Sequence, residues 1–230
     1  MWTPPPDDAP RRLADLRVHY DAGTLDWDDL DPDPYRSFQH WFDEAVAVGL
    51  PEPNAMIVAT ADAQGQPSAR TVLLKDLDSA GFQFFTNYDS RKGSELTENP
   101  RASLVFPWFA MHRQVVVIGS VQRIARTEVD AYFASRPRAS QLGAWASQQS
   151  MPIADRTDLD TGFAQLIERY GDEEPIPTPP FWGGFQVRTF SVECWQGRPA
   201  RLHDRLQFIA RSKDARLDDP SAWERQRLSP

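Results

Sequence analysis

The sequence of 230 residues predicts an α+β protein built on an antiparallel β-sheet that curls toward a barrel. Three observations predict this class. Apolar and polar residues alternate in several short segments between residues 55 and 124, which is the period of half-buried strands. Short turns, such as 62–66, join these segments, so consecutive strands are expected to pair antiparallel. Strand patterns return after residue 185, and the early sheet is the only available partner for them, which favours closure of the sheet.

The chain is expected to begin with a disordered tail, residues 1–11, because this stretch is rich in proline and aspartate. The remainder, residues 12–230, is expected to fold as a single domain. Apolar residues at helical spacing predict a short amphipathic helix over 12–20. Asp33 is placed to cap a second helix, with Pro34 at its first position and an apolar stripe along the following turns.

Residues 70–93 form the segment around which the other elements are organised. Arg70–Asp76 is β-branched and aliphatic, Ser79–Gly81 supplies a turn, and Phe82–Asn87 continues as a second strand. Ser90 then opens a short helix. With the neighbouring alternating segments, this pattern predicts strands at 55–61, 68–76, 82–87, 102–109 and 113–124.

A helical block separates the early strands from the late ones. Thr127 and Asp130 are spaced as a capping box, and Pro137 ends the first helix. A proline-rich linker at 175–180 follows the third helix. The expected helices are 128–136, 141–149 and 158–170, and the expected late strands are 185–195, 201–210 and 223–228.

Composition and charge argue against several classes of function. The net charge is −8, which disfavours nucleic acid as a partner. No apolar run approaches the roughly 20 residues of a membrane helix, and the N-terminus lacks the pattern of a signal peptide. Cys194 is the single cysteine, so no intrachain disulfide can form and a cytoplasmic protein is expected. Its apolar strand context indicates a core residue rather than a nucleophile.

Familiar catalytic motifs are missing from the sequence. The chain lacks G-x-G-x-x-G, a P-loop and G-x-S-x-G. Its four histidines are isolated in sequence, and with one cysteine they give no basis for a metal site. The remaining candidates are cations whose positions are set by secondary structure.

Cations gather around the central hairpin. Arg91 and Lys92 follow Ser90 at a helix start, where free N–H groups and the helix dipole favour a phosphate. Arg70 and Lys75 lie just upstream, but an odd spacing puts them on opposite faces of an unbroken strand. Either a bulge intervenes or the ligand lies across the end of the strand. The competing interpretation is a surface hairpin with scattered charges.

A second group of cations lies near the C-terminus. If 201–210 is a strand, alternation puts Arg201, His203 and Arg205 on one face and Leu202 on the other, apolar face. Three potential cations on one face repel one another unless an anion offsets them. In an acidic protein this arrangement indicates a bound anion, and an exposed strand face is the alternative.

Tyr132, Arg136 and Ser140 form a third group. Tyr132 and Arg136 are four residues apart on a predicted helix, and Ser140 follows it. A forked cation with two hydroxyls makes a good phosphate clamp, although a plain helix surface would look the same in sequence. Gln114 and Gln149–Ser150 supply neutral amides and a hydroxyl, which suit the polar edge of a heterocycle.

Several blocks of the sequence resemble one family, in order along the chain. They are RTVLLK, FFTNYDSRKG, NPRASLVFPW, RQVVVIG, YFASRPRASQLGAWASQQS, PPFWGGFQV, WQGRPARLHDR and the terminal RLSP. From about Leu16 to Pro230 the chain resembles the FMN-dependent pyridoxine/pyridoxamine 5′-phosphate oxidases. The resemblance implies an antiparallel split β-barrel with flanking helices, a homodimer, and two FMN sites at the dimer interface.

The resemblance also assigns site residues. Arg201 and His203 are the implied catalytic residues, Arg201 orienting the 4′ substituent and His203 hydrogen-bonding to it or steadying charge. The implied FMN contacts are Arg70, Thr71, Val72, Leu73, Leu74, Lys75, Phe85, Thr86, Arg91, Lys92, Gln114, Gln149, Ser150, Trp195 and Arg205. The implied substrate contacts are Arg17, Tyr20, Lys75, Tyr132, Arg136, Ser140, Arg201, Leu202 and His203.

The chain departs from the family pattern at two of these places. Residues 17–20 read Arg-Val-His-Tyr where relatives often carry a second arginine and a glutamate, which bears on whether Arg17 and Tyr20 form a lid over the substrate. Phe85 stands where a tyrosine is common, so a hydroxyl contact is lost there.

The implied activity is oxidation of pyridoxamine or pyridoxine 5′-phosphate to pyridoxal 5′-phosphate. Dioxygen is the acceptor, hydrogen peroxide is released, and the amine substrate also gives ammonia. Three alternatives stay open: a flavin oxidase of the same fold that acts on another ring, such as a phenazine precursor, a non-catalytic flavin- or vitamer-binding protein, and a plain structural barrel.

Overall fold

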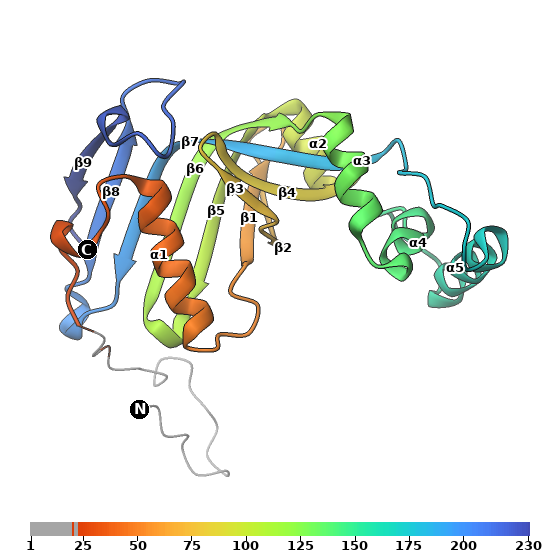
Figure 1. Ribbon diagram of the computed structural model, residues 1–230, viewed down its shortest axis with the longest axis horizontal. Coiled ribbons are helices and arrows are strands. Elements are labelled where there is room, and N and C mark those ends of the chain that lie inside the picture. The colour runs from red at the N-terminus through yellow and green to blue at the C-terminus, as the bar shows by residue number, and fades with distance from the viewer. Residues whose placement is uncertain (1–19, 21–22) are drawn as a thin grey trace, which may run out of the picture.

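The computed structural model describes Tyr20 and residues 23–230, so the predicted tail and nearly all of the predicted helix at 12–20 lie outside the described residues. Nine strands join into one curled sheet in which every pairing is antiparallel. This arrangement confirms the predicted fold class (Figure 1). The strands are β1 (Ala55–Ala61), β2 (Pro67–Leu73), β3 (Asp76–Asp78), β4 (Gly81–Asn87), β5 (Arg101–Trp108), β6 (Arg113–Arg123), β7 (Trp182–Gln196), β8 (Asp204–Ala210) and β9 (Trp223–Arg227).

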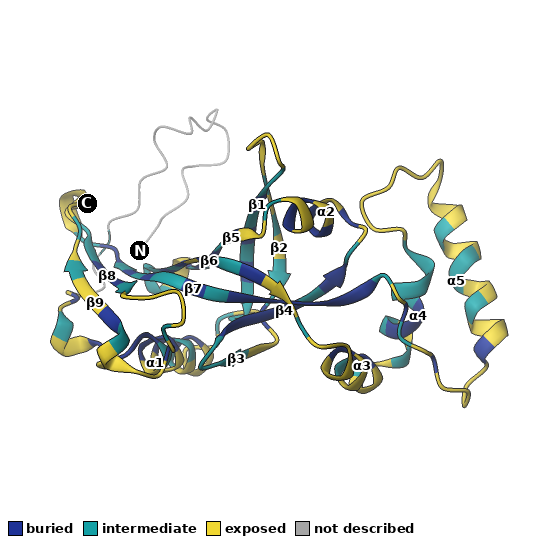
Figure 2. Cartoon of the chain, turned by 90° about the horizontal axis from the view of Figure 1, so that it is seen from above, coloured by how far each residue is buried: buried dark blue, intermediate teal, exposed yellow. Residues whose placement is uncertain are grey.

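The longest strand, β7, connects the two ends of the molecule. Its first half pairs with β4 and its second half with β8, while β6 pairs along both halves. The register of β6 against β7 shifts at Ile118/Gly119, where the backbone carbonyl of Arg188 approaches so closely that a Cβ on Gly119 would lie 2.2 Å from it. Strands β8 and β9 therefore lie at one end of the molecule, and the helical block lies at the other (Figures 1 and 2).

Helix α1 (Pro34–Ala47) covers one face of the sheet (Figure 1). It begins as predicted, because the Asp33 side chain accepts a hydrogen bond from the Arg36 backbone N–H at 2.9 Å and Pro34 occupies the first turn. Phe38 packs edge-on against Phe82, with ring centroids 5.0 Å apart, and joins the large core between helix and sheet.

The helical block has its own small core, centred on Phe133, Tyr170 and Trp182. The predicted capping box at Thr127 and Asp130 is wrong. The first helix of the block begins at Arg126 without a side-chain cap, and Asp130 instead forms an ion pair with Arg126 at 2.9 Å. The helices after α1 are α2 (Arg91–Glu98), α3 (Arg126–Ser135), α4 (Arg138–Ala146) and α5 (Arg156–Tyr170).

Two predicted strands are interrupted. The strand predicted over 68–76 ends at Leu73, and the chain re-enters the sheet as β3 on the far side of β4. The strand predicted over 201–210 begins only at Asp204, because the preceding 3-10 turn (η4, Pro199–Arg201) holds Ala200 and Arg201 at φ values of 55° and 64°. Among the helices of the described chain, none is long and apolar enough to cross a membrane.

The turn between β8 and β9 is anchored by Leu217, which is 1% exposed in the core. Its N–H donates to the Ser79 carbonyl at 2.8 Å, and its carbonyl accepts from the Tyr35 N–H at 3.2 Å. Replacing Leu217 with alanine is expected to lower the free energy of unfolding by about 2–4 kcal/mol, because it leaves a cavity in the core. Urea denaturation measures this, and Val48→Ala, at a position 63% exposed, serves as the control. Equal stability of the two variants would contradict the anchoring role.

Candidate functional site

A cavity of about 970 Å³ opens between β2, the end of β4, the start of α2, and helices α3 and α4. Most of the predicted contacts meet here. Leu74 is an exception, because its side chain is buried in the core. The predicted residues that line the cavity are Arg70, Thr71, Val72, Leu73, Lys75, Phe85, Thr86, Arg91, Lys92, Tyr132, Arg136, Ser140, Gln149 and Ser150.

The break after β2 explains how Arg70 and Lys75 reach the same cavity. An unbroken strand would send them to opposite faces. The strand ends at Leu73, and the Lys75 N–H donates to the Gln83 carbonyl of β4 at 2.9 Å. Lys75 therefore lies where the chain crosses from β2 to β3, and of the two possibilities left open by the sequence, the end of the strand is the correct one.

The start of α2 supplies the most buried cation of the cavity. Ser90 caps the helix, and the first turn holds no acidic residue. Lys92 is 7% exposed, and its ammonium donates to the hydroxyl of Thr86 at 3.0 Å, to the amide oxygen of Gln149 at 2.8 Å and to the Ser90 hydroxyl at 3.3 Å. All three acceptors are neutral. Burial, and secondly the nearby Arg70 guanidinium, lower the pKa of Lys92 to about 8.

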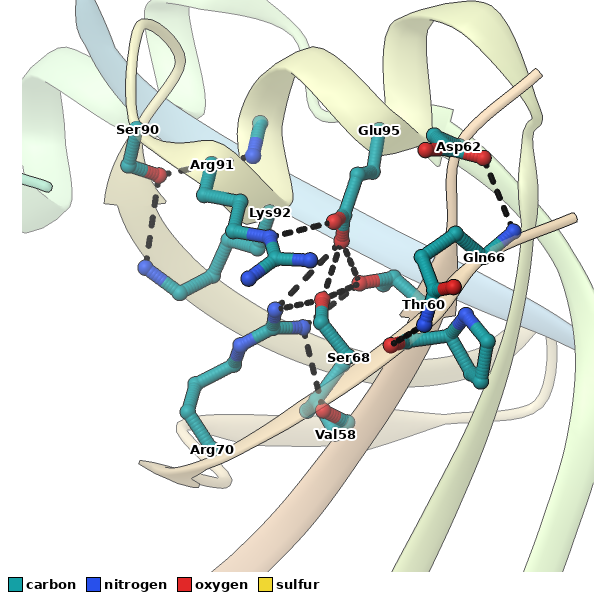
Figure 3. A network of polar contacts seen from close by, with 12 residues as sticks. Val58, Thr60, Asp62, Gln66, Ser68, Arg70, Ser90, Arg91, Lys92 and Glu95 are labelled. Carbon is teal, nitrogen blue, oxygen red and sulfur yellow. Dashed lines mark hydrogen bonds and ion pairs between the residues drawn. The ribbon is translucent and has the colours of Figure 1, made fainter. Parts of the chain in front are cut away.

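A buried carboxylate, Glu95, connects the two arginines of this cluster (Figure 3). Its Oε1 accepts from Arg91 Nε at 2.8 Å, and its Oε2 lies 3.4 Å from Arg70 Nη2. Oε2 also accepts from the hydroxyls of Thr60 and Ser68. Burial alone would raise the pKa of Glu95, but the hydrogen bonds from Ser68, Thr60 and Arg91 and the charge of Arg70 outweigh it and lower the pKa to about 2.

Replacing Glu95 with glutamine is expected to reduce stability at pH 7 by about 3 kcal/mol, since the folded pKa lies well below its ordinary value. The sign follows from the direction of the shift. The stabilisation is complete above the ordinary value of 4.5 and is lost as the pH falls toward 2. Denaturation between pH 7 and pH 3 should show a shallower acid loss for Glu95→Gln than for the native protein.

Glu98→Gln is the matched control for Glu95→Gln. Glu98 lies one turn further along α2, is exposed, and accepts only a long backbone hydrogen bond from Ala63 at 3.4 Å. The two variants remove the same charge from the same helix. If both lose the same stability, the buried network does not stabilise the fold in the way described.

The charges of this cluster do not cancel. Arg70, Arg91 and protonated Lys92 contribute three positive charges and Glu95 contributes one negative charge, which leaves two. A phosphate monoester carries about −1.5 to −2 at pH 7. The cluster therefore offers a complement for one phosphate.

Arg136 and Tyr132 of the helical block form a second polar group that lines the same cavity. Arg136 Nη1 is buried and has no hydrogen-bond partner among the described residues. Burial lowers the pKa of Arg136, with the Tyr132 hydroxyl acting weakly in the other direction. The ring of Tyr132 stacks on Phe85, with centroids 4.0 Å apart. Thus Phe85, which lacks the common tyrosine hydroxyl, makes a stacking contact.

Apart from Leu74, the other predicted residues that the structure describes lie at the far end of β7. Gln114, Trp195 and Tyr20 line a separate cavity of about 240 Å³. Trp182, on the wall of the large cavity, and Trp195 are 13 residues apart on one strand, or about 43 Å at ~3.3 Å per residue. A single copy of the chain does not bring its two groups of predicted site residues together.

The predicted common face of Arg201, His203 and Arg205 is wrong, because the first two precede the strand. Arg201 ends the 3-10 turn, and Leu202 is 69% exposed rather than buried with the core. His203 Nδ1 accepts a hydrogen bond from the Arg198 N–H at 3.0 Å. Arg205 is paired with both oxygens of Glu193, at 2.8 and 3.0 Å, so a carboxylate already offsets its charge.

Of the predicted lid residues, Arg17 lies outside the described residues and Tyr20 lies inside them. The Tyr20 ring meets the rings of His112, Trp195 and His203 edge-on, with centroids 4.8, 5.9 and 5.5 Å apart. Tyr20 therefore lies with the predicted site residues at the end of β7 that is far from the large cavity. Glu95 and Trp182, which also belong to the large cavity and its cation cluster, were not predicted from the sequence. The i, i+4 spacing of Arg91 and Glu95 could have predicted their ion pair, whereas no local pattern in the sequence indicates that Trp182 lies beside the cavity.

Comparison with known proteins identifies the family of the chain. The model of the family "Pyridoxamine 5′-phosphate oxidase" matches residues 42–175, and that of the "Pyridoxine 5′-phosphate oxidase C-terminal dimerisation region" matches residues 182–230. The chain belongs to the pyridoxine/pyridoxamine 5′-phosphate oxidase family. The resemblance inferred from the motifs is confirmed. The dimerisation region of the family corresponds here to residues from β7 to β9, a stretch that contains the predicted site residues Trp195, Arg201, Leu202, His203 and Arg205.

Relatives in this family match almost end to end. A protein from Salinispora arenicola named pyridoxine/pyridoxamine 5′-phosphate oxidase is 56% identical over 218 residues, covering 94% of this chain and 96% of that protein. One of the same name from Rubrobacter xylanophilus is 50% identical over 225 residues, covering 98% and 100%.

Solved structures support the fold. The structure of PhzG from Burkholderia lata 383, in complex with tetrahydrophenazine-1-carboxylic acid, is 28% identical with a TM-score of 0.81, covering 93% of this chain and 100% of that one. A pyridoxamine 5′-phosphate oxidase-related, FMN-binding protein from Nostoc punctiforme has a TM-score of 0.67 at 15% identity, covering 86% and 98%. The latter likeness concerns the fold alone.

Proposed function

We propose that this protein oxidises pyridoxamine or pyridoxine 5′-phosphate to pyridoxal 5′-phosphate, with FMN as cofactor and dioxygen as acceptor. Hydrogen peroxide is released, and the amine substrate also gives ammonia. One observation carries the proposal: two separate groups of cations line a single cavity, which is what a phosphorylated cofactor and a phosphorylated substrate require. The single cysteine, Cys194, is buried and free, which is typical of a protein that functions in the reducing cytoplasm.

The donor set of the cavity fits FMN. The cluster of Arg70, Arg91, Lys92 and Glu95 has the net charge that complements a phosphate dianion. Lys92 is a buried cation with only neutral acceptors, so an anion would relieve the cost of its burial. Gln149 and Thr86 lie beside it and supply further hydrogen-bonding groups. The flavin phosphate would be held here, and the residues of β2 that line the cavity would contact the rest of the cofactor.

The substrate phosphate is assigned to Lys75, Tyr132, Arg136 and Ser140. These residues line the other part of the same cavity, and Arg136 Nη1 lacks a partner. Holding the phosphate fixes the pyridine ring at one end, so that the 4′ carbon is presented in one orientation. When bound, the flavin supplies the electron acceptor for that carbon and passes the electrons to dioxygen.

The site is completed by a second copy of the chain in this proposal. His203 lies beside Trp195, at the end of β7 that is about 43 Å from Trp182 in the cavity wall at ~3.3 Å per residue, and Arg201 and His203 belong to the region that matches the family's dimerisation region. Arg201 of the partner subunit would orient the 4′ substituent, and His203 of the partner subunit would hydrogen-bond to it. His203 is held for this by the Arg198 N–H and by the ring of Trp195, 4.7 Å away.

The visible spectrum of the purified protein tests the proposal. Anaerobic addition of pyridoxamine 5′-phosphate should bleach the flavin band, and air should restore it with release of pyridoxal 5′-phosphate. A yellow protein that does not bleach would instead be a flavin-binding protein without this activity. A protein that bleaches only with an unphosphorylated ring, such as a reduced phenazine acid, would be an oxidase of the other kind.

A further inference from the structure

Three aromatic rings from three different elements stack beside the cavity. Phe85 comes from β4, Tyr132 from α3, and Trp182 is the first residue of β7. Phe85 lies between the other two, with centroid distances of 4.0 Å to Tyr132 and 5.4 Å to Trp182 and interplanar angles of 18° and 9°. All three residues line the cavity, and Trp182 is 6% exposed. The stack fixes Tyr132 through contacts that need no hydrogen bond.

The same indole ring carries a guanidinium. Arg136 Cζ lies 4.8 Å from the centroid of Trp182 and 5.5 Å from that of Phe133. Arg136 follows the last turn of α3, where its carbonyl accepts from the Gln141 amide at 2.8 Å, so its backbone is fixed as well. Among the described residues, no carboxylate pairs with Arg136, and its Nη1 is buried without a partner.

The two cation groups of the cavity are therefore held by different means. Arg70 and Arg91 share the carboxylate of Glu95, which fixes them and cancels one charge. Arg136 is fixed by aromatic faces, which attract a cation through the ring quadrupole and cancel no charge. A carboxylate in the place of Trp182 would fix Arg136 equally well but would compete with an incoming anion.

We propose that Trp182 is a positioning residue that sets the preference of the site for phosphorylated vitamers. This inference rests on the proposed function. By holding Arg136 on its face and Tyr132 through Phe85, Trp182 presents an uncancelled cation and a hydroxyl to the substrate phosphate. Trp182 contacts Arg136 and Phe85, and it affects binding of the substrate phosphate through these residues.

The test uses Trp182→Leu and Trp182→Phe in the FMN-loaded, full-length protein. Trp182→Leu removes the aromatic face and is expected to raise KM for pyridoxamine 5′-phosphate about tenfold, with kcat changed less than threefold, as expected for a lost cation–π contact of a desolvated guanidinium. Trp182→Phe keeps a ring and should restore KM to within about threefold of the native value. Trp145→Leu is the matched control, because Trp145 packs on the same small core without touching Arg136.

Two binding measurements separate positioning from a general structural effect. The Kd of pyridoxal 5′-phosphate should rise for Trp182→Leu as KM does, whereas the Kd of unphosphorylated pyridoxal and of FMN should stay within threefold. In an Arg136→Ala background, Trp182→Leu should raise KM clearly less than it does in the native protein, since the guanidinium that it positions is gone and only its contribution through Phe85 to Tyr132 remains. Should Trp182→Leu not fold, Trp182→Phe in the native and Arg136→Ala backgrounds gives the same comparison with a smaller effect.

The inference is overturned if Trp182→Leu weakens phosphorylated and unphosphorylated ligands alike. It is also overturned if Trp182→Phe is as impaired as Trp182→Leu, or if the effects of Trp182 and Arg136 add. These outcomes differ from failure of the proposed function, in which the native protein itself would neither bleach with pyridoxamine 5′-phosphate nor release the aldehyde.

Discussion

Lys92→Met is expected to weaken FMN binding about a hundredfold, because it removes a buried, charge-assisted partner of the cofactor phosphate. Lys92 is 7% exposed, and among the described residues its ammonium meets neutral acceptors, so a bound phosphate would supply a counter-charge. Methionine keeps the length and the apolar stem of the side chain. Titration of the apoprotein with FMN, followed by the quenching of flavin fluorescence, measures the change.

The pH dependence of FMN binding checks the same assignment. The pKa of free Lys92 is about 8, and a bound dianion favours the protonated form. The affinity of the native protein should therefore fall above pH 8, by up to tenfold per pH unit, whereas Lys92→Met should lack this fall. Since burial disfavours the ammonium in the folded protein, Lys92→Met should not be less stable than the native protein at pH 7.

Lys213→Met is the control for this experiment, because Lys213 is exposed in the turn between β8 and β9, away from the large cavity. It removes the same charge from the whole protein. If Lys92→Met binds FMN within threefold of the native affinity, or if Lys213→Met loses the same affinity, Lys92 does not hold the phosphate.

Mixed dimers of two impaired variants, purified and assayed without added FMN, are expected to regain activity. Lys92→Met alters the cavity, and Arg201→Ala alters the C-terminal group at the other end of β7. Arg201→Ala alone should lower kcat at least about a hundredfold with FMN retained, because Arg201 is assigned to the reacting side of the substrate. In a mixed dimer whose sites each combine the two halves from different copies, one site carries both substitutions and the other carries neither.

Co-expression of the two variants with random pairing makes half of the dimers mixed, so the preparation should show about a quarter of the native activity per chain. Two differently tagged chains, purified through both tags, raise this to about a half. If each site were instead built within one copy, every site in the mixed dimer would carry one substitution and activity would not return. Absence of recovery in the doubly purified dimer would refute the composite site.

Much of the fold could be predicted from the sequence, because the deciding signals are local. Alternation marked β1, β4, β5 and β6 within one or two residues, and Asp33 with Pro34 marked the start of α1. The interruption after Leu73 had no such mark. No glycine or proline stands there, and the break follows from the chain crossing to the far side of β4, which is a tertiary event.

The error at Arg201–Arg205 has a different cause. The residues alternate as a strand would, but Ala200 and Arg201 adopt left-handed backbone conformations that strand periodicity cannot reveal. The site could be predicted only in part, because several of its contacts join residues on different elements. Thr60 on β1 and Glu95 on α2 meet Arg70 of β2 from other elements, and the partner of Arg205 is a carboxylate on the neighbouring strand.

The length of β7 has a genetic consequence. In the proposed pair, each copy of this strand begins at one site and ends at the other, so a change that bends it, for instance at the Gly119 bulge, disturbs both sites at once. Such an allele would be dominant. A cell that makes equal amounts of sound and bent chains would keep intact only the pairs formed by two sound copies, about one in four.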